Sequence, residues 1–420
     1  MRLPRSCLPA AALLLAVPPA NASAAPAGPT ADGPVRPAPL RPTAGERVPD
    51  HYIVTLRTGS SPRTLASRVG VNPDFIYTHA LNGFAATLTA EQLEAVRSAP
   101  YVAAVEQDAV LAQADAPRAG VSPADVPRAG VSPADVRGVG PRVGTDTYGL
   151  DRIDQRNLPL DSRFNATSTG EGATAYVMDT GIDYTHPDFG GRAKNGTDLV
   201  TSGGDGADCP TGSGHGTHVA GVIGGAAYGV ARRATLVSVR VLDCTGKTTI
   251  AKFIAGFDYV ARTAVPASVL NASLSGPASQ AVNTAVGNVA ARGVPLVVAA
   301  GNENDNACNH SPAGTLTALA VGATDRLDRM TDFTDYGPCA RILAPGADIV
   351  SDRIGGGTTT KSGTSQAAPH VAGVAALYKA RNPAASSATV INWLIEQSTK
   401  NVARDMKPGT PNRLLYTGGL

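Results

Sequence analysis

The chain has 420 residues, enough for one large domain and one smaller domain. Hydrophobic residues make up 43% and aromatic residues only 5%, so we expect a core built from Ala, Val, Leu and Ile. Lys and Arg number 36 against 34 Asp and Glu, which gives a formal net charge of +2. So balanced a charge provides no reason to expect a nucleic-acid or membrane partner.

The first residues have the pattern of an export signal. Arg2 and Arg5 are positive, residues 8–17 form an apolar run, and residues 22–24 are small enough for signal cleavage. The alternative is a membrane anchor, but about 10 apolar residues are too few for a bilayer core that needs roughly 20. We therefore predict a signal peptide over 1–24 and a secreted, extracellular product.

A small domain is predicted over residues 50–112, after a lead-in over 25–49 whose Pro and Ala content indicates disorder. Its predicted elements are strands over 52–56, 84–88 and 101–106 and a helix over Ala90–Ser98 that Thr89 would cap. Strands and a helix that alternate within about 60 residues indicate a small α+β sandwich.

Residues 113–146 form a predicted linker with a tandem ten-residue repeat. The sequence PRAGVSPADV occurs at 117–126 and again at 127–136. Two copies are too few for a solenoid, which needs at least about three. Pro and Gly in each copy favour an exposed tether, so we expect any maturation cleavage of the chain to fall in this linker.

The remaining residues, 147–417, have the pattern of one large α/β domain. The clearest elements are apolar strands over 173–178 and 296–300 and helices over 251–262, 281–292 and 366–381. Continuous apolar strands that are separated by helices predict a mainly parallel sheet with helices on both faces.

Three short motifs in this domain contain candidate catalytic residues. Asp179 ends an apolar strand before a Gly turn, His215 opens a small-residue helix in the sequence GHGTHVAG, and Ser365 begins another helix in SGTSQAAP. Taken singly, each has a simple structural explanation as a turn residue, a packed His or an N-cap. The three motifs together, each with a Gly nearby, predict that these residues act at one functional site.

The residue types fit nucleophilic catalysis. A Ser hydroxyl becomes a good nucleophile only when a neighbouring imidazole takes its proton. A buried carboxylate then holds the other ring nitrogen and stabilises the imidazolium. The N-terminus of the Ser365 helix would add positive character where an oxyanion forms. We therefore predict Asp179 as the charge-stabilising residue, His215 as the base and Ser365 as the nucleophile.

From residue 148 to 416 the chain resembles the subtilisin-like serine proteases, in particular their proteinase K and aqualysin branch. The order Asp, His, Ser is the known order in subtilisin. The resemblance implies a subtilisin-like α/β fold with His215 as the base, and it leaves His218 to pack its helix. Residues 51–111 resemble the family's inhibitory propeptide, a small ferredoxin-like α+β domain that assists folding and then blocks the site.

The resemblance also implies the residues that surround the nucleophile. Asn302, in the sequence VVAAGN, would donate to the oxyanion, and its alternative role is that of a turn residue after a strand. The substrate-binding residues would be an edge that pairs with extended peptide and a facing pocket wall: Ser273, Leu274 and Ser275, and Ala299, Ala300 and Gly301. Relatives usually have Gly where this chain has Ser275, so we expect a narrower pocket rim.

Four cysteines remain once Cys7 leaves with the signal peptide, and an even number in an exported protein predicts disulfides. A zinc site is the rival, but no Cys-x-x-Cys pair or clustered Cys/His spacing supports it. The residues alone permit three pairings. The resemblance implies Cys209 with Cys244 and Cys308 with Cys339.

No cofactor is expected for catalysis, but a structural calcium ion is. Asp151, Asp154, Gln155 and Asp161 resemble an N-terminal calcium loop of this branch, and their alternative role is a polar surface turn. A second calcium site of proteinase K-like enzymes uses an Asp where this chain has Arg341. A cation there excludes that site.

Two further residues bear on activity. Gln366 follows the nucleophile where relatives commonly have Met, so we expect tolerance of oxidants, with slower turnover through crowding as the alternative. Glu303 follows Asn302 and is expected at the mouth of the primary pocket. It predicts that the pocket accepts some substrates with Lys or Arg in addition to those with apolar residues. The alternative role of Glu303 is that of an ordinary solvated acid.

The sequence therefore predicts a secreted serine endopeptidase, made as a preproenzyme, with broad specificity and an acyl-enzyme mechanism. We expect it to be a monomer that acts on proteins and peptides and is inhibited by its own propeptide. A narrow processing protease is a second possibility, which acidic clusters around the pocket would favour. An inert protease-like binding module is a third, and it would lack a member of the catalytic set.

Overall fold

The structure is a computed structural model that describes residues 36–113 and 147–420. The predicted signal peptide, residues 25–35 of the lead-in and most of the linker with its repeat lie outside the described residues. The rest of the lead-in, which was expected to be disordered, contains strand residues: 40–41 pair with 105–106, and Arg47 pairs with Ala109. Within the described part, no helix combines the length and the apolar character that a bilayer crossing needs.

The N-terminal part is a sheet with two helices on one face. Its elements are β1 (Leu40–Arg41), β2 (Arg47–Leu56), α1 (Pro62–Arg68), β3 (Phe75–Tyr77), β4 (Gly83–Thr87), α2 (Ala90–Ser98) and β5 (Val102–Gln113). Strand β2 lies between β4 and β5 and is antiparallel to both. Helix α2 has the predicted bounds, and Thr89 and Gln92 form a reciprocal capping box at its start.

The larger part is built on a nine-stranded sheet in the order β18-β19-β15-β14-β12-β10-β6-β8-β7, in which only the β18–β19 pair is antiparallel among the described pairs. Its strands are β6 (Thr174–Asp179), β7 (Ala193–Asp198), β8 (Thr235–Arg240), β10 (Ser268–Ala272), β12 (Leu296–Ala299), β14 (Ala318–Thr324), β15 (Ala340–Pro345), β18 (Thr399–Lys400) and β19 (Arg413–Leu414).

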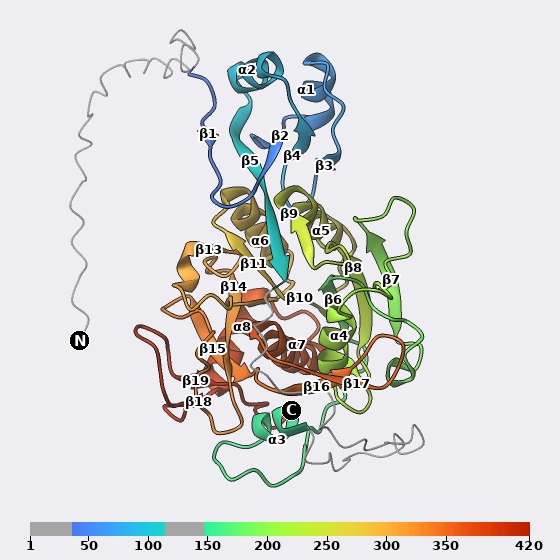
Figure 1. Cartoon of the computed structure of the whole chain (residues 1–420), viewed down its shortest axis with the longest axis vertical. Helices are drawn as coiled ribbons and strands as arrows, with labels where there is room; N and C mark the ends of the chain where they lie inside the picture. Colours follow the sequence, from blue (N-terminus) through green and yellow to red (C-terminus); the bar gives the residue numbers. More distant parts are fainter. Residues whose placement is uncertain (1–35, 114–146) are drawn as a thin grey trace, which may run out of the picture. The chain divides into compact units, whose positions relative to one another are not determined.

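Helices cover both faces of this sheet (Figure 1). They are α3 (Tyr148–Ile153), α4 (His215–Gly224), α5 (Ile250–Thr263), α6 (Gln280–Ala291), α7 (Thr364–Arg381) and α8 (Ser387–Gln397). Successive strand side chains point to opposite faces. Tyr176 and Met178 of β6 therefore pack with α5 and α6, whereas Ala175 and Val177 pack with α4, α7 and α8. The sheet is mainly parallel and buried on both sides, as predicted.

Short elements complete the fold. The strands β9 (Lys247–Thr249), β11 (Leu274–Pro277) and β13 (His310–Ser311) extend the sheet of the N-terminal part. Outside the two large sheets lie the strands β16 (Ile349–Asp352) and β17 (Thr358–Lys361) and the 3₁₀ turns η3 (Pro187–Phe189) and η4 (Ala307–Asn309). Strands β16 and β17 form an antiparallel hairpin. The predicted helices correspond to α5, α6 and α7, and their ends differ from the predicted ends by at most two residues.

The last strand of the small sheet is longer than predicted. The sequence indicated a strand over 101–106, but β5 continues to Gln113. The reason is tertiary: its final residues pair with β9 on one side and with β11 on the other, both antiparallel. Val110 lies opposite Thr249, and Ala112 lies opposite Ser275. In Figure 1, β5 leaves the small sheet to reach these two strands.

Two acidic residues of β5 meet the starts of α5 and α6. Asp108 Oδ1 accepts the backbone N–H of Ala251 at 3.1 Å, and Glu106 Oε2 accepts that of Ala281 at 3.2 Å. Carboxylates are favourable at helix N-termini, where N–H groups lack intrahelical partners. The opposite arrangement also occurs, since Asp258 of α5 accepts three consecutive backbone N–H groups of residues 78–80.

His51 of β2 connects this interface to the rest of the small sheet. Its Nδ1 lies 2.8 Å from Asp108 Oδ2, and its Nε2 lies 2.8 Å from Asp74 Oδ2. Burial lowers the pKa of His51, but the hydrogen bonds to Asp108 and Asp74 outweigh burial, so the pKa is raised. The protonated ring therefore stabilises the same Asp108 that contacts α5.

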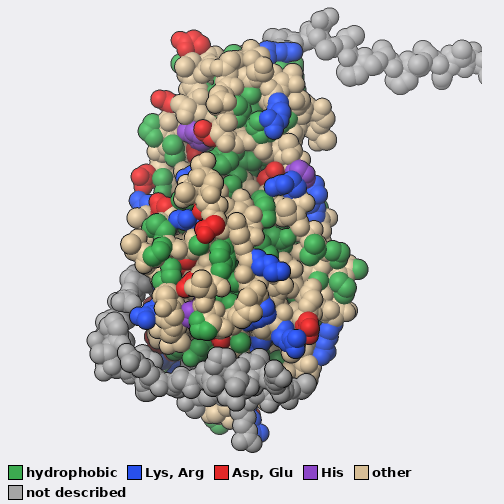
Figure 2. All heavy atoms as spheres, turned by 90° about the vertical axis from the view of Figure 1, so that its right-hand side faces the viewer, with side chains coloured by type: hydrophobic (Ala, Val, Ile, Leu, Met, Phe, Trp, Pro, Cys, Tyr) green, Lys and Arg blue, Asp and Glu red, His purple; other side chains and the backbone are tan. Residues whose placement is uncertain are grey.

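The surface agrees with the near-neutral composition. Figure 2 shows Lys and Arg side chains interspersed with Asp and Glu over one face of the molecule. No region of one sign dominates the described atoms in that view.

Candidate active site

Asp179 and His215 meet where β6 ends and α4 begins. His215 Nδ1 lies 2.7 Å from Asp179 Oδ1, and both side chains are fully buried. The backbone N–H of Thr180 donates to the same oxygen at 2.7 Å. The carboxylate is thus held in place and fixes one ring nitrogen of His215.

The close approach of α4 to β6 depends on a glycine and a buried carboxylate. A Cβ on Gly216 would collide with the carbonyl oxygen of Gly181. Asp208 accepts the Thr180 hydroxyl at 2.8 Å and the hydroxyl and N–H of Thr217, while the Gly216 N–H donates to the Thr180 hydroxyl at 2.9 Å. Burial raises the pKa of Asp208. The sequence analysis missed Asp208, which has no motif of its own.

Ser365 is the second residue of α7 and is tied to the segment before β11. Its hydroxyl donates to the Ser273 carbonyl at 3.2 Å, and the Ser273 hydroxyl donates to the Ser365 carbonyl at 3.1 Å. Helices α4 and α7, which carry His215 and Ser365 in their first turns, pack against each other in the same core cluster. The other histidine of the motif, His218, lies 3.0 Å from the Ile349 carbonyl through Nε2, a structural contact.

Asn302 follows β12 and is oriented by the residue before the nucleophile. Its Oδ1 accepts both the N–H and the hydroxyl of Thr364, each at 3.0 Å. The Thr364 hydroxyl also accepts the Gly301 N–H at 3.2 Å. The amide oxygen therefore accepts hydrogen bonds, and the NH₂ group is the donor end of this side chain.

The predicted substrate edge and pocket wall lie on neighbouring elements. Leu274 and Ser275 begin β11 and pair with Gln113 and Ala112 of β5. Ala299 and Ala300 are fully buried at the end of β12. An extended segment of the chain therefore occupies the edge at which an extended peptide is expected to pair.

Asp335 lies beside this wall, and the sequence analysis missed it. It is fully buried, and its Oδ1 accepts the N–H groups of Glu303 and Asp305 at 2.9 and 3.0 Å. Burial raises the pKa of Asp335 to about 6, and the Glu303 carboxylate adds to the rise. His310 Nε2 lies 3.8 Å from Asp335 Oδ2. A single Asp between a strand and a Tyr-Gly turn gives no sequence signal of such a position.

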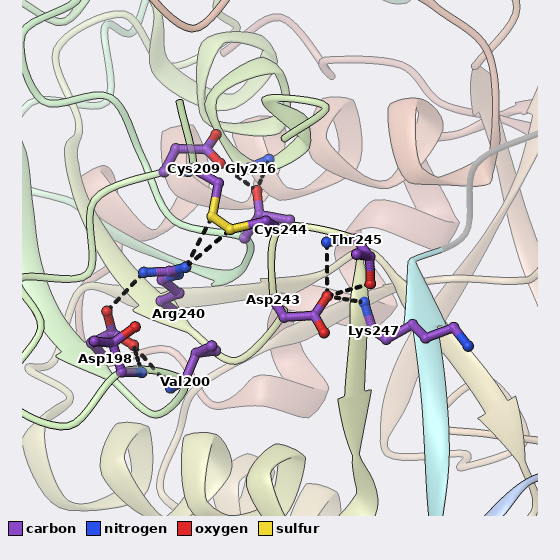
Figure 3. The surroundings of a disulfide bond; sticks show 12 residues. Asp198, Val200, Cys209, Gly216, Arg240, Asp243, Cys244, Thr245 and Lys247 are labelled. Atoms are coloured by element: carbon purple, nitrogen blue, oxygen red, sulfur yellow. Dashed lines mark hydrogen bonds and ion pairs between the residues drawn. A yellow bond between two sulfur atoms is a disulfide. The ribbon is translucent and has the colours of Figure 1, made fainter. Parts of the chain in front are cut away.

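The structure joins Cys209 to Cys244 and Cys308 to Cys339, the pairs that the resemblance implied. Figure 3 shows the first bond between the segment before α4 and the turn before β9, with Arg240 beside it. Arg240 Nη2 donates to Cys209 Sγ at 3.0 Å, and its Nη1 lies 3.0 Å from Asp198 Oδ2. The bond therefore connects the helix of His215 to a strand that pairs with β5.

The residues of the expected calcium loop lie together, with Asp151 in α3 and the others at its C-terminal end and in the loop that follows. Asp161 N–H lies 3.2 Å from both Asp151 Oδ1 and Gln155 Oε1, and Asp154 Oδ2 accepts a backbone N–H at 2.6 Å. Asp154 Oδ1 is buried without a hydrogen-bond partner among the described residues. Burial raises the pKa of Asp154 to about 6, with further contributions from Asp161 and Asp151. An unpartnered oxygen among repelling carboxylates fits a hard cation.

A different group has metal-ligand spacing in the part of the chain that the structure describes. Ligand atoms of Glu303, His310 and Asp335 lie within 4.8 Å of one another, whereas the carboxylates of residues 151–161 form no such group. Calcium also binds amide and backbone oxygens, so a calcium site in the loop does not require carboxylates this close together.

Arg341 supports the exclusion of the second calcium site. Its Nη1 donates to the Leu316 carbonyl at 2.8 Å and to the Ala318 carbonyl at 3.3 Å. Burial and the neighbouring Arg413 lower its pKa. A positive group therefore already contacts the carbonyls of this loop.

Comparison with known proteins places the chain in a family. Residues 170–415 match the subtilase family, and residues 68–113 match the peptidase inhibitor I9 family. The chain therefore belongs to the subtilases, the subtilisin-like serine proteases, and carries the inhibitor domain that indicates a proenzyme.

Relatives include serine proteases of bacteria. The chain is 41% identical to alkaline serine exoprotease A of Vibrio alginolyticus over 86% of its own length and 63% of that protein, so it spans less than two thirds of this relative. It is 44% identical to the extracellular serine proteinase of Thermus sp. (strain Rt41A), over 83% and 78% of the two chains. A cold adapted subtilisin-like serine proteinase of known structure is 46% identical, with a TM-score of 0.62, over 64% of this chain and 97% of that one.

Proposed function

We propose that this protein hydrolyses peptide bonds inside proteins through an acyl-enzyme formed on Ser365. His215 takes the proton of the Ser365 hydroxyl as it attacks the peptide carbonyl and returns it to the leaving amine. Asp179 holds the imidazole in the correct tautomer and stabilises the imidazolium. Asn302 and the N-terminus of α7 stabilise the negative oxygen of the tetrahedral intermediate. Water then releases the acyl group by the same steps.

The observation that carries this proposal is the 2.7 Å contact between His215 and Asp179, both fully buried. Its direct test is labelling with a fluorophosphonate probe, which should modify wild-type protein at Ser365 and fail on Ser365→Ala. A casein assay should give activity only for the wild type. Wild-type protein that folds but neither labels nor cleaves casein would contradict the enzymatic proposal and leave the inert binding module.

Asn302 provides a second test of the same site. Its amide oxygen holds Thr364, so Asn302→Asp keeps that acceptor but replaces the donor end, while Asn302→Ala removes both. Both variants should lose about 10²–10³ in turnover if the donor role is correct. Unchanged turnover in Asn302→Asp would leave Asn302 as a turn residue.

We infer that β5 acts as an intramolecular inhibitor in the precursor. Its end pairs with β11, which supports the view that it occupies the substrate edge in the manner of a product strand. Ser365→Ala should therefore accumulate with residues 51–111 attached, and the wild type should lose them. N-terminal sequencing of secreted wild-type protein would locate both the signal cleavage and the maturation site, which we place in 113–146.

We further propose the domain limits, cellular location and specificity. The limits are a signal peptide over 1–24, a lead-in over 25–49, a ferredoxin-like propeptide over 50–112 and a catalytic domain over 147–417. Extracellular relatives support export. Broad specificity and a monomeric state rest on the resemblance.

We propose that calcium binds the loop formed by Asp151, Asp154, Gln155 and Asp161. The unpartnered Asp154 oxygen and the raised pKa of its carboxyl support this site. The ion would fix the loop and take no part in the reaction. A chelator should lower the thermal midpoint of fluorophosphonate-labelled wild type by several degrees and leave that of Asp154→Asn unchanged.

A further inference from the structure

A buried carboxylate oxygen and a buried hydroxyl beside the pocket wall have no hydrogen-bond partner among the described residues. They are Asp335 Oδ2 and Ser275 Oγ. Gly301, which has a φ of +119°, lies between them: a Cβ added there would collide with Asp335 Oδ2 and would lie 3.3 Å from Ser275 Oγ. Both groups therefore lie near one point at the wall formed by Gly301.

Asp335 uses its two oxygens differently. Oδ1 is fully engaged by the backbone N–H groups of Glu303 and Asp305, so the side chain is rigid. Oδ2 accepts no hydrogen bond within the described residues. A buried carboxylate oxygen without a donor costs free energy unless a cation or a donor fills its place in the working state.

The charged groups around Asp335 carry an excess of negative charge that a cation would balance. The acidic groups are Asp335, Asp305 and the exposed Glu303. His310 is the nearest basic group, but its Nε2 is 3.0 Å from Asp305 Oδ2, nearer than to Asp335, and it is charged only when protonated. Lys407, the other cation that faces Asp335, donates instead to the carbonyls of Asp332 and Thr334.

We propose that the primary pocket receives a Lys or Arg side chain from the residue before the scissile bond, with Asp335 as the principal acceptor and Ser275 and Glu303 as further contacts. The inference rests on the proposed function and assigns its substrate class. Asp335 and Ser275 would accept the ammonium or guanidinium donors, and the exposed Glu303 would attract the cation to the rim. In the precursor, β5 pairs with Ser275, so the site becomes available on maturation.

The test compares three peptides that differ only in the residue before the scissile bond: Arg, its neutral isostere citrulline, and Phe. Wild-type enzyme at pH 8 should prefer Arg over citrulline at least about tenfold in kcat/KM, the effect of one hydrogen bond to a charged group. Asp335→Asn keeps the Oδ1 acceptor for Glu303 and Asp305 and should bring this ratio close to one. Asp332→Asn, an exposed acid on the same loop, is the matched control and should keep the wild-type ratio.

Several outcomes would overturn the proposal. These are equal cleavage of the Arg and citrulline peptides by the wild type, or a ratio that survives in Asp335→Asn. Inhibition by micromolar Zn²⁺ that Asp335→Asn abolishes, without any Arg preference in the wild type, would assign the cluster to a metal instead. If Asp335→Asn does not fold, Glu303→Gln should still lower the ratio about threefold, and an unchanged ratio would count against the proposal. Cleavage of the Phe peptide and labelling of Ser365 report the proposed function separately.

Discussion

The two disulfides offer a test in which similar losses of stability should accompany different losses of activity. They close loops of 35 and 31 residues. The chain-entropy model gives each bond about 4 kcal/mol, because the dependence on loop length is only logarithmic. With about 2.1 cal/mol/K of unfolding entropy per residue over about 270 residues, the loss of either bond should lower the thermal midpoint by about 7 °C.

Their effects on activity should differ because they hold different parts of the site. The Cys209–Cys244 bond connects the segment before α4 to the turn before β9, and β9 pairs with extended chain. Ser at both positions should reduce the advantage of long peptides over short ones by about fivefold, the value of one neutral hydrogen bond. Ser at Cys308 and Cys339 should leave that advantage unchanged.

The measurements are thermal unfolding of fluorophosphonate-labelled enzyme, which cannot digest itself, and kcat/KM for a long and a short peptide. Midpoints of both variants within 1 °C of the wild type would refute the loop-entropy argument. An equal fall of the long-to-short ratio in both variants would refute the assignment of the first bond to the substrate edge.

Three other predictions concern titration and oxidation. The pKa of His51 is raised, so the stabilisation that its protonated ring provides is complete below about pH 6.5 and is lost as the pH rises through the raised pKa. Limited proteolysis of the attached propeptide, measured in a Ser365→Ala background, should therefore accelerate toward pH 9. The same measurement on His51→Gln should hardly change with pH. Burial and the neighbouring Asp188 carboxyl raise the pKa of Asp352 well above its usual value, so ionisation of this carboxyl destabilises the fold as the pH rises. Asp352→Asn should therefore raise the thermal unfolding midpoint more at pH 9 than at pH 5. An equal change at both pH values would contradict this assignment. Mild peroxide should inactivate Gln366→Met within minutes and spare the wild type, since only the thioether forms a sulfoxide; equal inactivation would show that Gln366 confers no tolerance.

Local signals in the sequence were sufficient for most elements. Thr89 and Gln92 define the start of α2 through contacts within one turn, so its bounds could be predicted. Apolar runs such as that of β6 indicate buried strands without knowledge of their neighbours. The end of β5 could not be predicted, because its residues from Val110 onward form a strand by pairing with β9 and β11, which lie far away in the sequence.

The motifs of the candidate site could be predicted, but the buried carboxylates that hold the surrounding backbone could not. Asp179, His215 and Ser365 lie in short patterns that resemblance makes specific. Asp208 and Asp335 lie outside such patterns. Each is held by a segment that is distant in sequence: Asp208 accepts the hydroxyl of Thr180, and Asp335 accepts the N–H of Glu303. Hydrogen bonds of this kind depend on the folded backbone and leave no periodicity in the chain.

Arg341 has a consequence for how this enzyme responds to its medium. A bound ion exchanges with solvent and can be stripped by a chelator, but a guanidinium is attached to the chain and stays at its carbonyls at any calcium concentration. Chelation should therefore loosen the protein at the Asp154 loop and leave the segment from Leu316 to Ala318 in place. In calcium-poor surroundings, this part of the fold keeps its positive charge by covalent attachment.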